Sequence, residues 1–518
     1  MSTEETHADV FVYTGGGRAS IPNDVVHVRV DPSVALIPAR AFEGRNLLAE
    51  VELCEGLVEI GEYSFMYCDR SITKIVIPNS LRRIKGWAFA GSLRTPIRLH
   101  DGIESIGRGA FAECIFTNFR VPPLITVIPE SMLNDCATMF SLEMSENVTE
   151  IKGWALRYCY SLRNVAFPPN AVFGDNIFFK EGDEDGAKTD LQQLFGNLNA
   201  GIIRMLQHRF DGLPIHRLVY YQSYNPGVLQ NVISATNMRS GQRRTLRSKL
   251  DPTGNQQDCL GMTPLHILTC SSVHDLELYR LIVEKYPTNL ITEDRWGALP
   301  LLYAFWGAAP AEIIDFLLES YQSLYPGYEM NWTMMVETMG RCDMPKECIE
   351  NLLHVKQMFF PEQPIDWEYL LNKFASPSHN SFDGAHFQEC MRFLFTCGFS
   401  ERMEALPFKV WRDCIKQMVR AADFKLGGDS LNVLRSIRAN LFHFEDELPK
   451  LKEATTILEL ALWKVKMTEN ENIHQEVVYR RQKKVKTDES SIRSPCRATC
   501  GASVVIEHVL PFLITAEN

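Results

Sequence analysis

An isoleucine recurs through the first third of the chain at a nearly constant interval, and this repeat constrains the fold more than any other feature. The six anchors are Ile37, Ile60, Ile84, Ile106, Ile128 and Ile151. Their spacings are 23, 24, 22, 22 and 23 residues. A unit of this length is too small to bury its own apolar face. The repeat therefore predicts a solenoid in which stacked units share one continuous core.

Two further columns keep phase with the anchors. Five residues after each anchor stands a large apolar side chain: Phe42, Phe65, Phe89, Phe111, Leu133 and Leu156. Eight residues after each anchor stand Arg45, Cys68, Ser92, Cys114, Cys136 and Cys159. Free cysteine is among the most buried residue types, which favours a core column. The alternative is a metal or redox ladder, but no histidine interleaves with these positions at ligand spacing.

An apolar-x-apolar pair completes each unit, about 13 to 17 residues after the anchor. The pairs are Val51/Leu53, Ile75/Ile77, Ile97/Leu99, Phe119/Val121, Leu142/Met144 and Val165/Phe167. This alternation predicts a short strand whose two apolar side chains face the core while the middle residue points outward. An earlier pair, Val28/Val30, fits an incomplete capping repeat.

The units also match a known pattern. Ile60-Gly-Glu-Tyr-Ser-Phe65-Met-Tyr-Cys68 and Ile106-Gly-Arg-Gly-Ala-Phe111-Ala-Glu-Cys114 resemble the repeat "I-G-x-x-A-F-x-x-C-x-x-L-x-x-I-x-I-P" of the BspA-type leucine-rich-repeat family. The resemblance covers about residues 26–172. It implies a leucine-rich-repeat solenoid with short parallel strands along one face.

The outward residues of these strands are the candidate binding surface. They are Arg29, Glu52, Val76, Arg98, Arg120 and Glu143, with Ala166 at the end of the row. One interpretation is a solvated sheet face. The other is a partner-binding surface, which is how solenoids commonly use such a face. Arg98 and Arg120 fall on neighbouring repeats, and such a pair can meet an acidic partner segment.

Helical periodicity replaces the repeat after Leu191. The segment Asp258-Cys-Leu-Gly261-Met-Thr263-Pro264-Leu265-His266-Ile-Leu268 resembles the ankyrin signature "D-x-x-G-x-T-P-L-H-x-A", with Leu268 in place of the alanine. The resemblance is closest over about residues 258–325. It implies an ankyrin-like α-solenoid, and so a repeat protein of α+β class overall.

The residues of that signature have structural roles. Gly261 suits a turn with positive φ, and Thr263 can cap the helix that follows. Pro264 suits the first helical turn, where its missing N–H is not needed. His266 is expected to tie turns together by hydrogen bonds. A catalytic or metal role for His266, or for His216 in an earlier unit, is the alternative.

These patterns divide the chain into five parts. We predict an N-terminal extension (1–25), a leucine-rich-repeat domain (26–172), an acidic linker (173–190), an ankyrin-like helical repeat domain (191–468), and a basic polar tail with an apolar end segment (469–518). The tail holds a basic run at 480–486. This run is either a nuclear-localisation signal or a solvated charge run.

Composition bears on partners and location. The net charge of −11 makes nucleic acid an unexpected partner, because phosphate binding needs a basic face. The first residues lack the basic and apolar regions of a signal peptide, and no stretch is long enough to span a membrane. We therefore expect a cytoplasmic protein with reduced thiols, the nucleus being the alternative through residues 480–486.

No catalytic motif, metal-ligand set or phosphate-binding loop is present in the sequence, so we predict no enzyme activity, cofactor, metal or small-molecule substrate. The chain as a whole resembles proteins that join BspA-type leucine-rich repeats to a divergent ankyrin-like region. That resemblance implies a scaffold or adaptor that binds other proteins. The alternatives are an enzyme or metal-binding protein with its site in the degenerate helical region, and a nuclear regulatory protein.

Overall fold

The computed structural model describes residues 10–68, 72–95, 97–180, 188–222, 227–228, 252–272, 274–341, 346–366 and 369–370. Contacts divide the chain into two units, Met1–Met330 and Asn331–Asn518. The first unit therefore contains the repeats together with the helices that follow them. The residues of the acidic linker from 181 to 187, the basic run at 480–486 and the part of the predicted helical domain beyond residue 370 lie outside the described residues.

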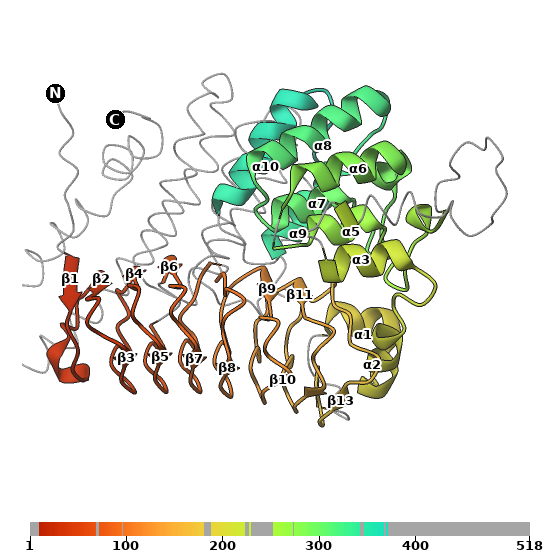
Figure 1. Ribbon diagram of the computed structural model, residues 1–518. Coiled ribbons are helices and arrows are strands. Elements are labelled where there is room, and N and C mark those ends of the chain that lie inside the picture. Colours follow the sequence, from red (N-terminus) through yellow and green to blue (C-terminus); the bar gives the residue numbers. More distant parts are fainter. Residues whose placement is uncertain are drawn as a thin grey trace, which may run out of the picture. The chain divides into compact units, whose positions relative to one another are not determined.

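Two rows of short parallel strands run along the repeats (Figure 1). The first row is β1 (Val10–Tyr13), β2 (His27–Val30), β4 (Glu50–Glu52), β6 (Lys74–Val76), β9 (Asn118–Arg120) and β11 (Ser141–Glu143). The second row is β3 (Leu36–Ile37), β5 (Glu59–Ile60), β7 (Arg83–Ile84), β8 (Ser105–Ile106), β10 (Val127–Ile128), β12 (Glu150–Ile151) and β13 (Val172–Phe173). The apolar-x-apolar pairs predict only the first row. The second is built from the anchors themselves.

The repeat columns form the core, as predicted. Ile60 lies in register with Ile37 on one side and Ile84 on the other, and all three side chains are at most 1% exposed. The rings of Phe65 and Phe89 stack with their centroids 5.2 Å apart. Each unit thus buries its apolar side chains against the same side chains of its neighbours, which is how a solenoid without a globular core is stabilised.

The cysteine column is part of this core. Cys68, Cys114, Cys136 and Cys159 are buried thiols. Each thiol donates a hydrogen bond to a backbone carbonyl of the preceding unit, as Cys136 Sγ does to Phe111 O at 3.2 Å. Burial raises the pKa of the Cys136 thiol well above its usual range, so the proton needed for this bond stays in place.

Each unit turns through two residues with a left-handed backbone, three and seven positions after the anchor. Most of them are not glycine, although positive φ is unfavourable for residues with a Cβ. Trp87 (φ 57°) and Gly109 (φ 61°) occupy the first of these positions in successive units. A Cβ on Gly109 would lie 2.5 Å from the indole of Trp87, so the ring of one unit lies over the glycine of the next.

The strand prediction needs two corrections before residue 100. The pair Ile97/Leu99 is buried, yet its backbone forms no strand. It follows Pro96, which has no N–H for a strand ladder. In addition, the predicted N-terminal extension contains β1. The buried Tyr13 at the end of β1 packs edge-on against Phe42, with ring centroids 5.0 Å apart, and so closes the aromatic column.

Helices follow the repeats in the first unit. They are α1 (Asp190–Phe195), α2 (Asn199–Gln207), α3 (Pro214–Gln222), α5 (Pro264–Thr269), α6 (Leu276–Lys285), α7 (Pro300–Trp306) and α8 (Ala311–Leu324). Three short 3-10 turns are η1 (Arg18–Ser20), η2 (Pro252–Asn255) and η3 (Pro287–Ile291). Helix α5 packs against α3, α6 and α7. Among the described residues, no helix is both long enough and apolar enough to cross a bilayer.

The turns that enter α5 and α7 have the same construction. The Asp258 carboxylate accepts the N–H groups of Leu260 and Met262, and the Asp294 carboxylate accepts those of Trp296 and Ala298. A glycine with positive φ follows each aspartate by three residues. The sequence predicted this conformation for the glycine of the first turn, and the structure confirms it.

The second unit is described over two helices, α9 (Trp332–Arg341) and α10 (Lys346–Phe359). Trp332 is 1% exposed and its indole N–H donates to Gln363 Oε1 at 2.7 Å. The ring also packs against Phe360, with centroids 5.6 Å apart. Trp332 therefore packs within this unit.

Candidate functional site

The first half of the outward strand row is open to solvent. Arg29, Glu52 and Val76 occupy matching positions on β2, β4 and β6. The Arg29 Nε–H donates to Glu52 Oε2 at 2.5 Å, and His27 Nε2 lies 2.9 Å from the other carboxylate oxygen. The hydrogen bond from Arg29 lowers the pKa of Glu52 despite partial desolvation. Val76 is 67% exposed, which is high for a valine in a strand.

The next two outward positions are arginines. Arg98 is exposed, and among the described residues it forms no ion pair with a carboxylate. Arg120 is half-buried and donates to Asp101 Oδ1 at 2.7 Å. The aspartate side chain is 67% exposed. The structure thus places both predicted arginines on neighbouring units of the same face, one paired at the surface and one not.

Glu143 departs from the expectation of an accessible row. Its side chain on β11 is buried, because the segment between α5 and α6 lies over it. The Ser272 N–H donates to Glu143 Oε1 at 2.6 Å, and the Ser272 hydroxyl lies 3.4 Å from Oε2. Burial raises the pKa of Glu143 to about 7, against the opposing effect of these hydrogen bonds and of Arg120.

The last outward position, Ala166, is also covered, and its strand is the second one that does not form. The Tyr220 hydroxyl on α3 donates to Leu142 O at 2.6 Å and accepts the Ala166 N–H at 3.1 Å. In a parallel ladder that N–H and that carbonyl would pair directly. Here the Tyr220 hydroxyl on α3 lies between them and bonds to both. The Phe167 N–H likewise donates to Leu206 O on α2 instead of to a strand.

The outward strand row therefore has two parts. We call Arg29, Glu52, Val76, Arg98 and Arg120 the open face. We call Glu143 and Ala166 the covered face. The segment between α5 and α6 lies at the border between the two faces. Burial lowers the pKa of His274 on that segment, and the nearby positive charge of Arg98 lowers it further.

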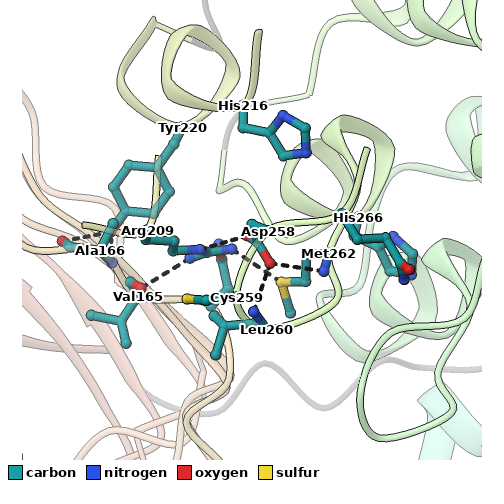
Figure 2. A network of polar contacts seen from close by, with 12 residues as sticks. Val165, Ala166, Arg209, His216, Tyr220, Asp258, Cys259, Leu260, Met262 and His266 are labelled. Carbon is teal, nitrogen blue, oxygen red and sulfur yellow. Dashed lines mark hydrogen bonds and ion pairs between the residues drawn. The ribbon is translucent and has the colours of Figure 1, made fainter. Parts of the chain in front are cut away.

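A buried arginine fixes the helices to the covered face (Figure 2). Arg209, between α2 and α3, donates to Asp258 Oδ2 at 2.7 Å, to Asn164 Oδ1 at 2.9 Å and to Val165 O at 2.9 Å. Its second terminal nitrogen lies 3.2 Å from Met262 Sδ. Both members of the ion pair are fully buried. Such a pair is tolerated when its polar groups are engaged, and here every guanidinium nitrogen and both carboxylate oxygens have a partner.

A second buried arginine makes the same kind of connection. Arg163, from the last repeat, donates to Asp190 Oδ2 at 2.6 Å. Its guanidinium lies 5.0 Å from the ring centre of Trp296 and 5.1 Å from that of Trp306. Cation–π contacts of this kind gain strength when they are desolvated. Helical residues thus surround side chains of the last repeat from several directions.

The two histidines considered for catalysis occupy structural positions. His266 Nε2 lies 3.0 Å from Ala298 O, and its Nδ1 faces the Thr263 hydroxyl at 2.8 Å. It ties two turns together, as the sequence predicted. His216 Nε2 lies 3.1 Å from Gln256 O in the same manner. Burial lowers the pKa of both, to about 4 for His216, so both are neutral at pH 7. The described residues contain no cluster of three metal-ligating side chains.

Sequence reasoning missed the residues that close the covered face. Arg209, Tyr220 and Ser272 belong to no repeat column and no known motif. Periodicity detects apolar positions, whereas these side chains act through one polar atom at a boundary between two kinds of structure. The only signal was local: Arg209 stands two residues before an Asp-Gly turn.

Comparison with known proteins agrees with the fold of the first part of the chain. Residues 23–92 and 58–182 match the BspA type leucine rich repeat region, in six copies. The N-terminal half of the chain therefore carries a BspA-type leucine-rich-repeat region, followed by a helical region. No curated protein matches the chain.

Solved structures similar to this chain include three leucine-rich-repeat proteins. The T. pallidum leucine rich repeat protein is 24% identical, with 28% of this chain and 72% of that one covered and a TM-score of 0.26. A leucine-rich repeat protein from Bacteroides ovatus is 24% identical, with 32% and 48% covered and a TM-score of 0.25. A leucine rich cell surface protein from Faecalibacterium prausnitzii is 18% identical, with 31% and 41% covered and a TM-score of 0.20. This chain spans less than half of the last two.

Proposed function

We propose that this chain is a non-enzymatic interaction protein that binds another protein on the open face. One observation carries the proposal. The outward strand row is already occupied by polypeptide at Glu143 and Ala166, whereas Arg29, Val76 and Arg98 at the equivalent positions are exposed. The covered face is thus an internal example of the contacts this surface can make with a protein.

The character of the covered contacts supports protein as the ligand. On that face, Glu143 accepts a backbone N–H, and Tyr220 inserts a hydroxyl between two backbone groups. Phe140 packs against the rings of Tyr303 and Trp306, with centroids 5.5 and 4.6 Å away. Backbone polar groups combined with aromatic anchors are typical of protein interfaces.

We further propose that the helical region is a divergent ankyrin-like array whose first units cap the repeats. The equivalent turns at Asp258 and Asp294 support this, as does the histidine that joins one turn to the next. A terminal repeat needs a cap because its apolar side chains have no further unit to cover them. The cytoplasmic location stays a prediction, and a reporter fused to residues 480–486 tests the nuclear alternative.

Photo-cross-linking tests the open face directly. A photoreactive phenylalanine analogue at Val76 is compared with the same analogue at Val172 on the second strand row. The two valines are matched, being 67% and 65% exposed. We expect a discrete protein adduct in source-cell extract from position 76 that is absent from position 172. Equal adduct patterns at both positions would move the binding surface elsewhere.

An activity screen on the same protein addresses the enzyme alternative. His266 is one of the two histidines that the sequence offered as catalytic candidates, and it is wholly buried. Turnover that is abolished by His266→Gln in a variant of unchanged stability would overturn the non-enzymatic proposal. We expect no turnover that depends on this residue.

A further inference from the structure

The open face has a chemical bias that narrows the choice of partner. Resting on the proposed function, we infer that it binds an extended acidic segment of a partner protein across Val76, Arg98 and Arg120. The segment presents one apolar side chain to the valine and carboxylates to the two arginines. Some charges of this face are already neutralised by neighbouring side chains, and others are not.

The carboxylates of the open face are already matched by cations. Glu52 accepts from Arg29 at 2.5 Å, and Glu50 Oε2 lies 3.1 Å from Lys74 Nζ on the next strand. These pairs leave no net charge on β2, β4 and β6 taken together. Arg98 has no such match among the described carboxylates. The uncompensated charge of the open face is therefore positive and is located at one unit.

The neighbouring arginine can be recruited to the same site. The carboxylate that Arg120 contacts belongs to Asp101, whose side chain is 67% exposed. An ion pair this accessible contributes little and exchanges readily with water. A partner carboxylate can replace Asp101 and then bridge both arginines. Arginine suits this role because its planar fork binds carboxylates in a bidentate manner.

An apolar contact lies beside this charged pair. Val76 precedes Arg98 by one unit in the same outward position and is 67% exposed. Adjacent strands lie about 4.8 Å apart, whereas alternate residues of an extended chain lie about 6.6 Å apart. A segment that crosses the strands obliquely can therefore place alternate side chains over successive units. The expected pattern is an apolar residue with acidic residues two and four positions away on one edge.

Nucleic acid fits the same surface less well. A phosphate backbone that continues past Val76 reaches Glu50 and Glu52 on the adjoining strand β4, whose charges are already matched by Lys74 and Arg29, so it finds no further unpaired cation there. A nucleic-acid-binding face collects several cations without intervening acids. The chain as a whole carries a net charge of −11. A short acidic peptide needs only the two arginines and the valine.

A peptide selection tests the inference even though the natural partner is unidentified. A random twelve-residue library displayed on its encoding RNA is selected on the full chain, in parallel with the Arg98→Gln and Val76→Glu chains. We expect peptides rich in Asp and Glu at alternate positions that are lost on both variants. Synthetic copies should bind about tenfold more weakly to Arg98→Gln, the size of one charge-assisted hydrogen bond.

Two matched variants sharpen the outcome. Arg108→Gln removes an exposed arginine that pairs with Glu130 outside the open face, and we expect it to leave peptide affinity unchanged within twofold. Asp101→Ala frees Arg120, and we expect it to strengthen binding two- to fivefold at low salt. Raising the salt should weaken the binding of every acidic peptide, because the pairs are exposed.

The results separate this inference from the proposed function. Peptides lost on Val76→Glu but without acidic enrichment, and insensitive to Arg98→Gln, would overturn the acidic partner and keep the open face as a binding surface. No peptide sensitive to either variant would overturn both. Tighter Arg98-dependent binding of a twelve-nucleotide poly(dT) than of any acidic peptide would overturn the inference in favour of nucleic acid.

Discussion

The open and covered faces are built from the same repeat, and they differ in what meets their outward side chains. On the open face Arg29 and Glu52 satisfy each other at the surface. On the covered face the carboxylate of Glu143 is out of water and depends on a helical segment for its hydrogen bonds. The repeat thus fixes the backbone of both faces but not their partners. An outward side chain can be substituted at little cost in stability where it is solvated. Where it is covered, it needs specific hydrogen-bond partners.

The largest difference should appear at two arginines of the helical region. Arg209 is fully buried beside Asp258, whereas Arg217 pairs with Glu146 at the surface. Arg209→Met leaves a buried aspartate without its counterion, and we expect it to reduce the free energy of unfolding by about 3–5 kcal/mol. Arg217→Met should cost about 1 kcal/mol or less. Urea unfolding followed by tryptophan fluorescence measures both.

A double variant checks that the cause is the unpaired charge. Adding Asp258→Asn to Arg209→Met removes the buried negative charge, so part of the lost stability should return. If the Arg209→Met and Arg217→Met variants are equally stable, the buried network does not anchor the covered face. The covered and open faces would then not differ in their dependence on helical partners.

An intermediate effect is expected where a helix enters the strand ladder. Tyr220→Phe removes the hydroxyl that lies between Leu142 O and the Ala166 N–H, both buried. We expect a loss of about 1–2 kcal/mol in the free energy of unfolding, the usual cost of leaving buried backbone groups unpaired. Hydrogen exchange at the amide of Ala166 should accelerate. An amide that stays fully protected in Tyr220→Phe would mean that the ladder closes directly once the hydroxyl is gone.

Tyr221→Phe is the matched control for this hydroxyl. Tyr221 packs against Tyr220 with ring centroids 4.9 Å apart, but no hydrogen bond to its hydroxyl is found among the described residues. We expect Tyr221→Phe to leave both the stability and the exchange rate of the Ala166 amide almost unchanged.

The fold of the repeats could be predicted from sequence because each position is specified several times. The columns of Ile60, Phe65 and Cys68 recur in phase, and their burial follows from stacking alone. The exception is instructive. The Ile97/Leu99 pair keeps the apolar alternation but loses the strand after Pro96, since burial and ladder pairing are separate requirements.

The candidate site could be predicted only in part. The outward direction of Arg29, Val76 and Arg98 follows from alternation, and the structure agrees. The burial of Glu143 does not follow, because its cover comes from Ser272, 129 residues further along the chain. A repeat specifies its own neighbours. The repeat pattern does not predict that a segment from another part of the sequence will pack against it.

The covered face should also respond to pH through Glu143. Its folded pKa of about 7 exceeds the usual value of a glutamate, so the folded state binds this proton more tightly than the unfolded state does. The contribution to stability is therefore present at low pH and is lost as the pH rises from about 4.5 towards 7. The slope for one group is at most about 1.4 kcal/mol per pH unit.

Glu143→Gln isolates this contribution. His216 and His274, whose pKa values are lowered to about 4, give the opposite trend over much of the same range, so only the difference between variant and wild type is informative. We expect the stability of Glu143→Gln relative to wild type to increase by about 2 kcal/mol between pH 5 and 7. A difference that is flat with pH would show that the carboxylate is hydrated and the face is not closed.

The smallest effect is expected on the open face, at Arg29→Gln. Both side chains of the Arg29–Glu52 pair are well exposed, so the free energy of unfolding should hardly change. The pKa of Glu52, which Arg29 holds below its usual range, should rise, and an NMR titration of its side-chain carboxyl carbon measures this. The sign is opposite to that of Glu143: the open-face pair contributes stability above the unfolded pKa and loses it as the pH falls. A pair so weakly coupled to folding is free to exchange its charges with those of a partner. A loss at Arg29 as large as that at Arg209 would mean that the open face is also held by structure, and so is not available for binding.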